Sequence, residues 1–254
     1  MLGTLEAIDF NKYDLILANP PYYQSAIMSK TAKETEMYTL GGLGVEALFL
    51  EWILKSLKPN GVGNVVLPDG IFSNLANKKI KEYILKNFFI ESIISLPINT
   101  FFNTPKKTYI LTIRKKSENE INENIQQDYP IFTYICKSIG ESLDVYRFDI
   151  EDNDLEKAIE KYNHYKKMPT ENKKNIKEPF KTYFEEDLQF KALDIKEFTA
   201  EKSWIIENWW TEEEKINIGL IKNQNIVTIG EFQDLLMDTM NMILKFKEDL
   251  ECMK

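Results

Sequence analysis

The chain has 254 residues, 43% hydrophobic and 12% aromatic, which suffices for a sizeable core and excludes a disordered chain or a small disulfide-stapled module. It carries 32 Lys and Arg against 40 Asp and Glu. The net charge of -8 excludes a protein that adheres nonspecifically to nucleic acid or anionic membranes, so any nucleic-acid contact must be local or supplied by a partner.

Histidine and cysteine are scarce. His164 is the only histidine, and the two cysteines, Cys136 and Cys252, are far apart. This composition disfavours histidine-based metal sites, Ser-His-Asp hydrolysis and zinc or redox cysteine motifs. The sequence has no run of 18 apolar residues and no basic start followed by an apolar stretch. We therefore expect a protein of the reducing cytoplasm that neither spans a membrane nor is secreted.

The first half of the chain alternates short apolar runs with segments at helical spacing. The predicted strands are residues 13–18, 62–67, 91–96 and 108–114, and the predicted helices are residues 45–57 and 74–87. No helix-length spacer separates the third strand from the fourth, which indicates a near-hairpin at one edge. This order predicts an α/β fold, a partial Rossmann-like sheet that is mostly parallel with an antiparallel edge strand.

The second half is more polar, and we divide the whole chain into three parts. A polar run at residues 115–128 precedes a predicted strand, a charged helix, a tryptophan-rich segment and a final helix, at residues 131–136, 154–167, 203–210 and 231–250. We expect a catalytic half at residues 1–116, a strand and helix extension at 117–194, and an α-rich tether towards a recognition or docking region at 195–254.

The first predicted strand ends at Asn19-Pro20-Pro21-Tyr22. The prolines fix the backbone and remove donors, so the Asn19 amide oxygen and the Pro20 carbonyl can both point outward as acceptors. Two rigid acceptors suit an amino group, whose lone pair becomes available for attack on a methyl group when both its hydrogens are bound. Tyr22 offers a flat face on which a planar substrate stacks. The tetrad therefore predicts catalysis on an aminated planar group, although Tyr22 has the alternative of packing in the core.

The run from Asp14 to Tyr22 resembles the catalytic motif of S-adenosylmethionine-dependent amino methyltransferases. Ordered blocks after it resemble the modification subunits of type I restriction systems: residues 46–51, 57–61, 65–70, 96–97 and 101–104. The resemblance covers about the first half of the chain. It implies DNA adenine-N6 methylation, because the cytosine-N4 enzymes look like Ser-Pro-Pro-Tyr where this chain has Asn19. Glutamine and some RNA methyltransferases carry the same tetrad, so both remain alternatives.

The resemblance also implies residues that hold DNA. In this family an aromatic residue of a later block stacks on the flipped base opposite Tyr22, and we assign this role to Phe102, with Phe101 as the second choice. Packing is an equally open reading of Phe102. Basic residues at Lys106 and Lys107 are candidates for the DNA backbone. The other clusters, Lys78, Lys79, Lys81 and Arg114, Lys115, Lys116, would extend a phosphate path around the tetrad, or would simply be solvated.

The family binds its cofactor through a glycine-rich turn and an acidic residue that precede the tetrad, and neither pattern occurs in this sequence. We therefore expect the carboxyl-terminal part of a methyltransferase, without the half that binds S-adenosylmethionine and without measurable affinity for it. The strand that ends at Asn19 should then form an exposed sheet edge.

The expected partners follow from this reading: double-stranded DNA, a specificity subunit or missing amino-terminal half, and self-association through the exposed edge. The reading from another class is a catalytically incomplete scaffold or partner-docking remnant, which the absent cofactor half and the acidic charge favour.

Overall fold

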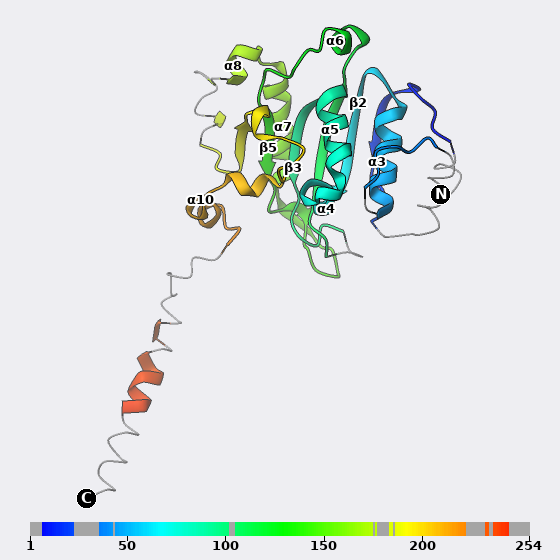
Figure 1. Cartoon of the computed structure of the whole chain (residues 1–254). Coiled ribbons are helices and arrows are strands. Elements are labelled where there is room, and N and C mark those ends of the chain that lie inside the picture. Colours follow the sequence, from blue (N-terminus) through cyan, green and yellow to red (C-terminus); the bar gives the residue numbers. More distant parts are fainter. Residues whose placement is uncertain are drawn as a thin grey trace, which may run out of the picture. The chain divides into compact units, whose positions relative to one another are not determined.

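A six-stranded sheet organises the computed structural model of this chain (Figure 1). The chain divides into two compact units, Met1–Trp210, which holds the sheet, and Thr211–Lys254. The structure describes residues 7–22, 36–42, 44–101, 105–174, 176, 183–184, 186–221, 232–233 and 236–243. Of the final helix predicted at 231–250, residues 232–233 and 236–243 are described and are helical, and the other half lies outside the described residues.

The sheet has the strand order β1-β2-β4-β3-β5-β8. Its strands are β1 (Tyr13–Ala18), β2 (Leu57–Pro68), β3 (Phe88–Ser95), β4 (Thr108–Lys115), β5 (Ile131–Ile135) and β8 (Phe190–Leu193). The pairs β1-β2 and β3-β5 are parallel, and β4 runs antiparallel to both of its neighbours. Four strands thus share one direction, which confirms the predicted α/β class.

The fourth predicted strand takes a different position from the one we expected. β4 lies between β2 and β3, and the antiparallel edge strand is β8. The residues of β4 explain its central place, because Tyr109, Leu111 and Ile113 are at most 1% exposed and Thr108 and Thr112 are buried as well. A strand that is buried on both faces cannot lie at an open edge.

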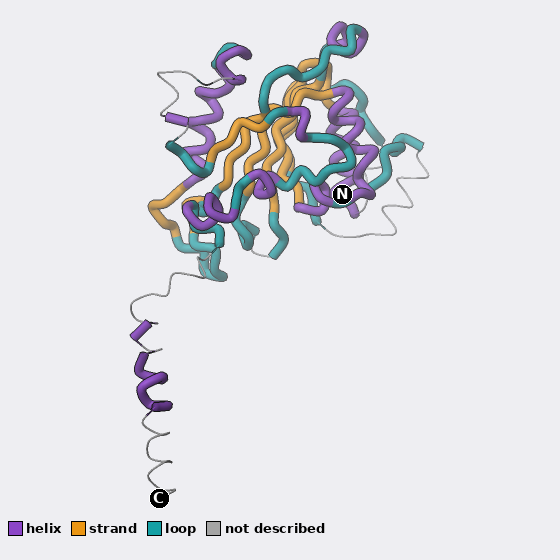
Figure 2. Tube along the Cα trace, turned by 60° about the vertical axis from the view of Figure 1, so that its left-hand side comes forward, coloured by secondary structure: helices purple, strands orange, loops and turns teal. Residues whose placement is uncertain are grey.

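Helices cover both faces of the sheet. α3 (Gly44–Ser56) and α5 (Lys78–Asn87) lie on one face, and α7 (Asp154–Lys167) lies on the other, beside β5 (Figure 2). α5 buries Ile80 and Ile84, four residues apart, as its helical spacing predicts. The shorter elements of the first unit are α4 (Asp69–Ser73), η1 (Leu75–Asn77), α6 (Glu118–Asn122), β6 (Ile139–Glu141), β7 (Asp149–Asn153), α8 (Thr170–Lys174), η2 (Ile195–Glu197) and η3 (Ile206–Trp209). The second unit contains α10 (Glu212–Asn217). In the described parts of the chain, no helix has the length and apolar character needed to cross a bilayer.

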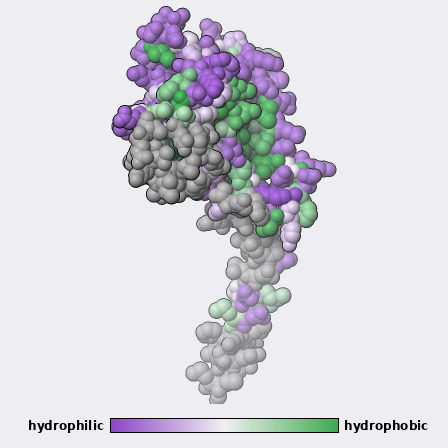
Figure 3. Space-filling model, turned by 90° about the vertical axis from the view of Figure 1, so that its right-hand side faces the viewer, coloured by the Kyte–Doolittle hydropathy of each residue, from purple (hydrophilic) through white to green (hydrophobic). Residues whose placement is uncertain are grey.

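β1 lies at one edge of the sheet, as we predicted for the strand before the tetrad. Among the described strands it pairs only with β2. Two of its leucines are largely open to solvent: Leu15 is 57% exposed and Leu17 is 71% exposed. Figure 3, turned towards this side of the molecule, shows hydrophobic residues gathered there. Within the part of the chain that the structure describes, this edge therefore combines backbone groups that no further strand pairs with an apolar face that is open to solvent.

The basic residues at the end of β4 do not line a path near the tetrad, so that part of our prediction is wrong. They lie at the carboxyl end of β4. Because β4 is antiparallel to β2, this end is on the opposite side of the sheet from the carboxyl ends of β1 and β2, where the tetrad lies. Lys115 Nζ donates to the Leu57 carbonyl at 2.8 Å, beside the end of α3, and Lys116 Nζ donates to the Lys86 carbonyl at 3.0 Å, near the end of α5. Arg114 pairs with Glu120. The two lysines stabilise helix ends.

The tryptophan segment, residues 203–210, packs into the first unit. Trp204 and Trp210 are each 2% exposed, and the Trp204 amide donates to the Phe72 carbonyl at 2.9 Å. Residues 195–210, which we assigned to a tether, therefore belong to the unit that ends at Trp210. The burial of large aromatic rings explains the difference.

Lys81 connects α5 to the residue that precedes this segment. Its side chain is buried, and Nζ donates to the carbonyls of Phe72 at 2.6 Å and Lys202 at 2.9 Å. Burial lowers the pKa of Lys81 from 10.5 to about 8. Between these values the unfolded chain binds more protons than the folded one, so this group makes the free energy of unfolding rise with pH across that window.

We expect Lys81→Met to lose that rise. Urea denaturation at several pH values between about 7 and 10 gives the free energy of unfolding of both proteins. The wild-type value minus the variant value should increase with pH. Lys79→Met, at an exposed position of the same helix, is the control and should show a constant gap. A constant gap for Lys81→Met would contradict the assignment.

Candidate active site

The tetrad forms the turn that follows β1. Asn19 is exposed, Pro20 is buried, and Pro21 and Tyr22 are partly buried. The neighbouring parallel strand β2 ends at Pro68, so the turn lies at the carboxyl edge of the sheet, where open α/β folds place ligands. The Asn19 amide is thus presented to solvent rather than packed in the interior.

Tyr22 orients the Asn19 amide. Its hydroxyl donates to Asn19 Oδ1 at 2.5 Å and lies 3.3 Å from the carbonyl oxygen of Val66 in β2. Burial, and then the nearby Glu46 carboxylate, raise the pKa of Tyr22, so the hydroxyl keeps its proton and remains a donor. An amide oxygen has two lone pairs, and the second can accept from a substrate. The contact therefore orients the Asn19 amide oxygen and leaves one of its lone pairs available to a substrate.

A second aromatic ring lies against Tyr22. The ring of Phe101 meets it edge-on, with centroids 6.2 Å apart and planes at 68°. Phe101 was our second choice for the stacking partner. The first choice, Phe102, lies outside the described residues, so its stacking role stays a prediction.

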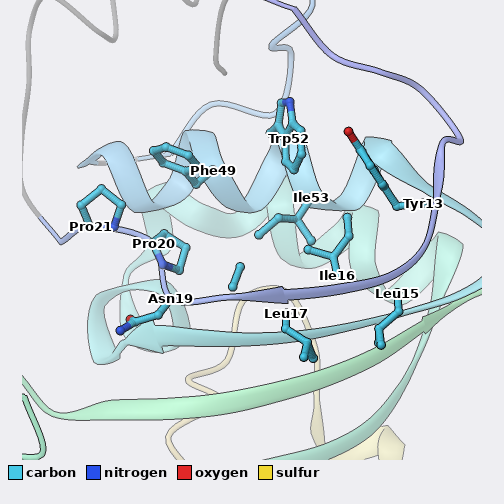
Figure 4. Close-up of a pocket in the computed structure, with 11 residues that line it drawn as sticks. Tyr13, Leu15, Ile16, Leu17, Asn19, Pro20, Pro21, Phe49, Trp52 and Ile53 are labelled. Atoms are coloured by element: carbon cyan, nitrogen blue, oxygen red, sulfur yellow. The ribbon is translucent and has the colours of Figure 1, made fainter. Parts of the chain in front are cut away.

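A cavity of about 500 Å³ opens beside the tetrad, between β1 and α3. In Figure 4, Pro20 and Pro21 approach Phe49 at one end, and Tyr13 approaches Trp52 at the other. The lining is mostly apolar: Tyr13, Leu15, Ile16, Leu17, Ala18, Asn19, Pro20, Pro21, Phe49, Trp52 and Ile53. Phe49 and Trp52 of α3 are only partly buried and line this cavity.

The two candidate DNA contacts differ in their surroundings. Lys106 is exposed, whereas the side chain of Lys107 is 20% exposed and its Nζ lies 3.0 Å from Glu207 Oε1. Both lie in the segment between β3 and β4, at the same end of the strands as the tetrad. Their contact with a DNA backbone stays a prediction.

Sequence reasoning missed two carboxylates of this region. Glu46 lies in the first turn of α3, and its Oε2 is buried without a hydrogen-bond partner among the described residues. Glu207 reaches the sheet from η3. Glu207 belongs to no recognisable motif, and Glu46 opens the block at residues 46–51 without a role that the block assigns to it. Only the fold shows that the two carboxylates lie here. Within the described residues, no group of three or more His, Cys, Asp or Glu side chains is placed to hold a metal ion.

Known proteins resemble this chain in sequence and in fold. A family model described as N-6 DNA Methylase matches residues 3–192. The type II methyltransferase M.HincII of Haemophilus influenzae is 26% identical over 177 residues, which are 63% of this chain and 35% of that protein. M.BanIII, a type II methyltransferase of Aneurinibacillus aneurinilyticus, is 27% identical over 124 residues, 48% of this chain and 21% of that protein. The chain thus spans about a third or less of the length of these relatives.

One solved structure shares the fold over nearly the whole chain. It belongs to a type I restriction-modification system, and the match covers 95% of this chain and 45% of that chain. The TM-score is 0.52 and the sequence identity is 16%.

Proposed function

We propose, since this chain belongs to the N-6 DNA methylase family, that it forms the base-binding part of an adenine-N6 DNA methyltransferase of a restriction-modification system. The observation that carries the proposal is the exposed Asn19 amide at the carboxyl end of β1, with Oδ1 oriented by Tyr22. The type II methyltransferases among its relatives support the restriction-modification role.

In this proposal Asn19 and Pro20 activate the adenine amino group. An amino group that donates to the Asn19 amide oxygen and to the Pro20 carbonyl loses conjugation with its ring, so the nitrogen lone pair becomes available for methylation. S-adenosylmethionine supplies the electrophilic methyl group when it is bound. Pro21 keeps the turn rigid, and Tyr22 stacks on the flipped base, with Phe101 or Phe102 as the second ring.

The cavity beside the tetrad fits one part of this cofactor. Its apolar lining, with Pro20, Pro21 and Phe49 at one end, suits a flat aromatic ring. None of the described lining residues is a carboxylate, which ribose hydroxyls and the amino group of the methionine part would need. We propose that another segment or subunit supplies these carboxylates and that this chain alone does not bind the cofactor measurably.

Double-stranded DNA and a second polypeptide are the proposed partners. Lys106 and Lys107 would contact the DNA backbone near the tetrad, a local basic site on an acidic chain. The exposed edge of β1 would pair with a strand of the polypeptide that carries the cofactor groups, or with a second copy of this chain. A specificity subunit would supply recognition of the DNA sequence. We expect this assembly to act in the compartment that holds the DNA, which the cysteine usage predicts to be the cytoplasm.

The test is the chemical identity of the product. DNA incubated with the complete native assembly and S-adenosylmethionine should contain N6-methyladenine by mass spectrometry, and the chain alone should produce none. N4-methylcytosine, or methylation only of RNA or of a protein glutamine, would refute the proposed substrate. No transfer by the complete assembly to any of these would favour the scaffold reading.

A further inference from the structure

One carboxylate connects both ends of the loop between β3 and β4. Glu207 Oε1 lies 2.5 Å from Ser95 Oγ, in the last residue of β3, and 3.0 Å from Lys107 Nζ, just before β4. Its Oε2 accepts from the Tyr109 hydroxyl, near the start of β4, at 2.9 Å. The Leu96 amide also donates to the Thr108 carbonyl at 3.0 Å. Glu207 therefore joins the two strands where the loop leaves them.

This cluster is shielded from solvent. The side chain of Glu207 is 16% exposed and that of Lys107 is 20% exposed, while Ser95 and Tyr109 are buried. Burial alone would raise the pKa of Glu207, but the Lys107 ammonium and the Ser95 hydroxyl lower it on balance, so the group remains a carboxylate at neutral pH. A charge-assisted contact in such a setting is screened less by salt than a surface pair.

The tryptophan segment holds Glu207 in place. Trp204 Nε1 donates to the Thr199 carbonyl at 2.8 Å, and Trp210 Nε1 donates to the Leu188 carbonyl at 2.7 Å. Lys191 Nζ donates to the Trp209 carbonyl at 2.9 Å. These anchors on both sides of Glu207 hold its carboxylate at the two ends of the loop.

We propose that Glu207 is a positioning residue that sets the loop carrying Phe101 against Tyr22, and thereby the aromatic grip on the substrate base. The inference rests on the proposed function, because it needs a base between or beside these rings. It assigns a role to the carboxyl-terminal part of the first unit, which no motif indicated. The loop ring binds the flipped base in the ground state and the transition state alike, so its displacement should weaken binding of DNA more than it slows the chemical step.

The experiment measures steady-state kinetics of the complete native enzyme with Glu207→Gln, which removes the charge and keeps the shape. We expect KM for DNA to rise about tenfold, with kcat and KM for S-adenosylmethionine within about twofold of wild type. Fluorescence of 2-aminopurine at the target position should show less base flipping at a DNA concentration near the wild-type KM, and wild-type flipping when DNA is saturating. Glu197→Gln, in η2 and paired with Lys202 at the surface, is the matched control and should match wild type.

Three outcomes overturn the inference. An unchanged KM for DNA shows that the loop does not depend on Glu207. A fall in kcat with similar rises in KM for DNA and in KM for S-adenosylmethionine shows general damage. If Glu207→Gln does not fold, Glu207→Asp is measured in the same way, and it should raise KM for DNA by a smaller factor; wild-type kinetics in that variant would also overturn the inference. A wild-type enzyme that forms no N6-methyladenine refutes the proposed function instead, which separates the two failures.

Discussion

Asn19→Ala in the complete enzyme is expected to lower the rate of methyl transfer by about 10²- to 10³-fold, the usual effect of losing one preorganised polar group at the reacting centre. The Asn19 amide is exposed, so its loss should leave little cost in folding. It makes no contact with the DNA backbone in the proposed function, and affinity for DNA should stay within about twofold of wild type. Tritiated methyl incorporation measures the first quantity and fluorescence anisotropy of labelled DNA measures the second.

The control for this variant is another exposed asparagine. Asn74 accepts from the Ala76 amide at 2.9 Å as the cap of η1, and Asn74→Ala should keep full turnover. Retained turnover in Asn19→Ala would remove the amide from the mechanism. A parallel loss of DNA binding would instead give Asn19 a role in holding the substrate.

Local patterns were sufficient to predict most elements of the sheet. The alternation of apolar runs with helical spacing predicted β1, α3 and β4 within one residue of their observed bounds. It also predicted β2, β3 and α5, but β2 begins five residues earlier, β3 three residues earlier and α5 four residues later than expected. The place of β4 depends on which strands bury both of its faces, which is a property of the packed sheet. β7 escaped prediction because Asp149–Asn153 is acidic and exposed, and such residues carry little strand propensity.

In the candidate site, too, local sequence predicted some features and only the fold determined others. Asn19 and Tyr22 were predicted because rigid neighbours in the sequence define their chemistry. The hydrogen bond from Tyr22 to Asn19 needs a backbone turn whose course two prolines restrict but do not determine. Lys115 and Lys116 illustrate the opposite case: a basic run suggests phosphate contacts, while the fold uses these ammonium groups on helix carbonyls. Glu207 meets Ser95 across 112 positions of sequence, a separation that carries no local signal.

The free edge of β1 leads to the second large effect. An exposed strand with an apolar face pairs readily with another strand, so this chain without partners should sediment as dimers or larger species. Leu17→Lys places a charge on that face. Burial of a leucine side chain contributes about 1.5–3 kcal/mol, so the variant should weaken self-association roughly 10- to 100-fold and shift the chain towards monomer. Sedimentation velocity over a concentration series measures the shift.

Leu75→Lys is the matched control, because Leu75 is 67% exposed but lies in η1, away from the β1 edge. It should associate as wild type does. A wild-type chain that sediments as a single monomeric species without any partner would argue against a sticky edge. In the complete assembly, Leu17→Lys should reduce methyl transfer in proportion to the lost partner, and excess partner should restore it, whereas no excess restores Asn19→Ala. That contrast separates the surface that assembles the enzyme from the residue that acts on the base.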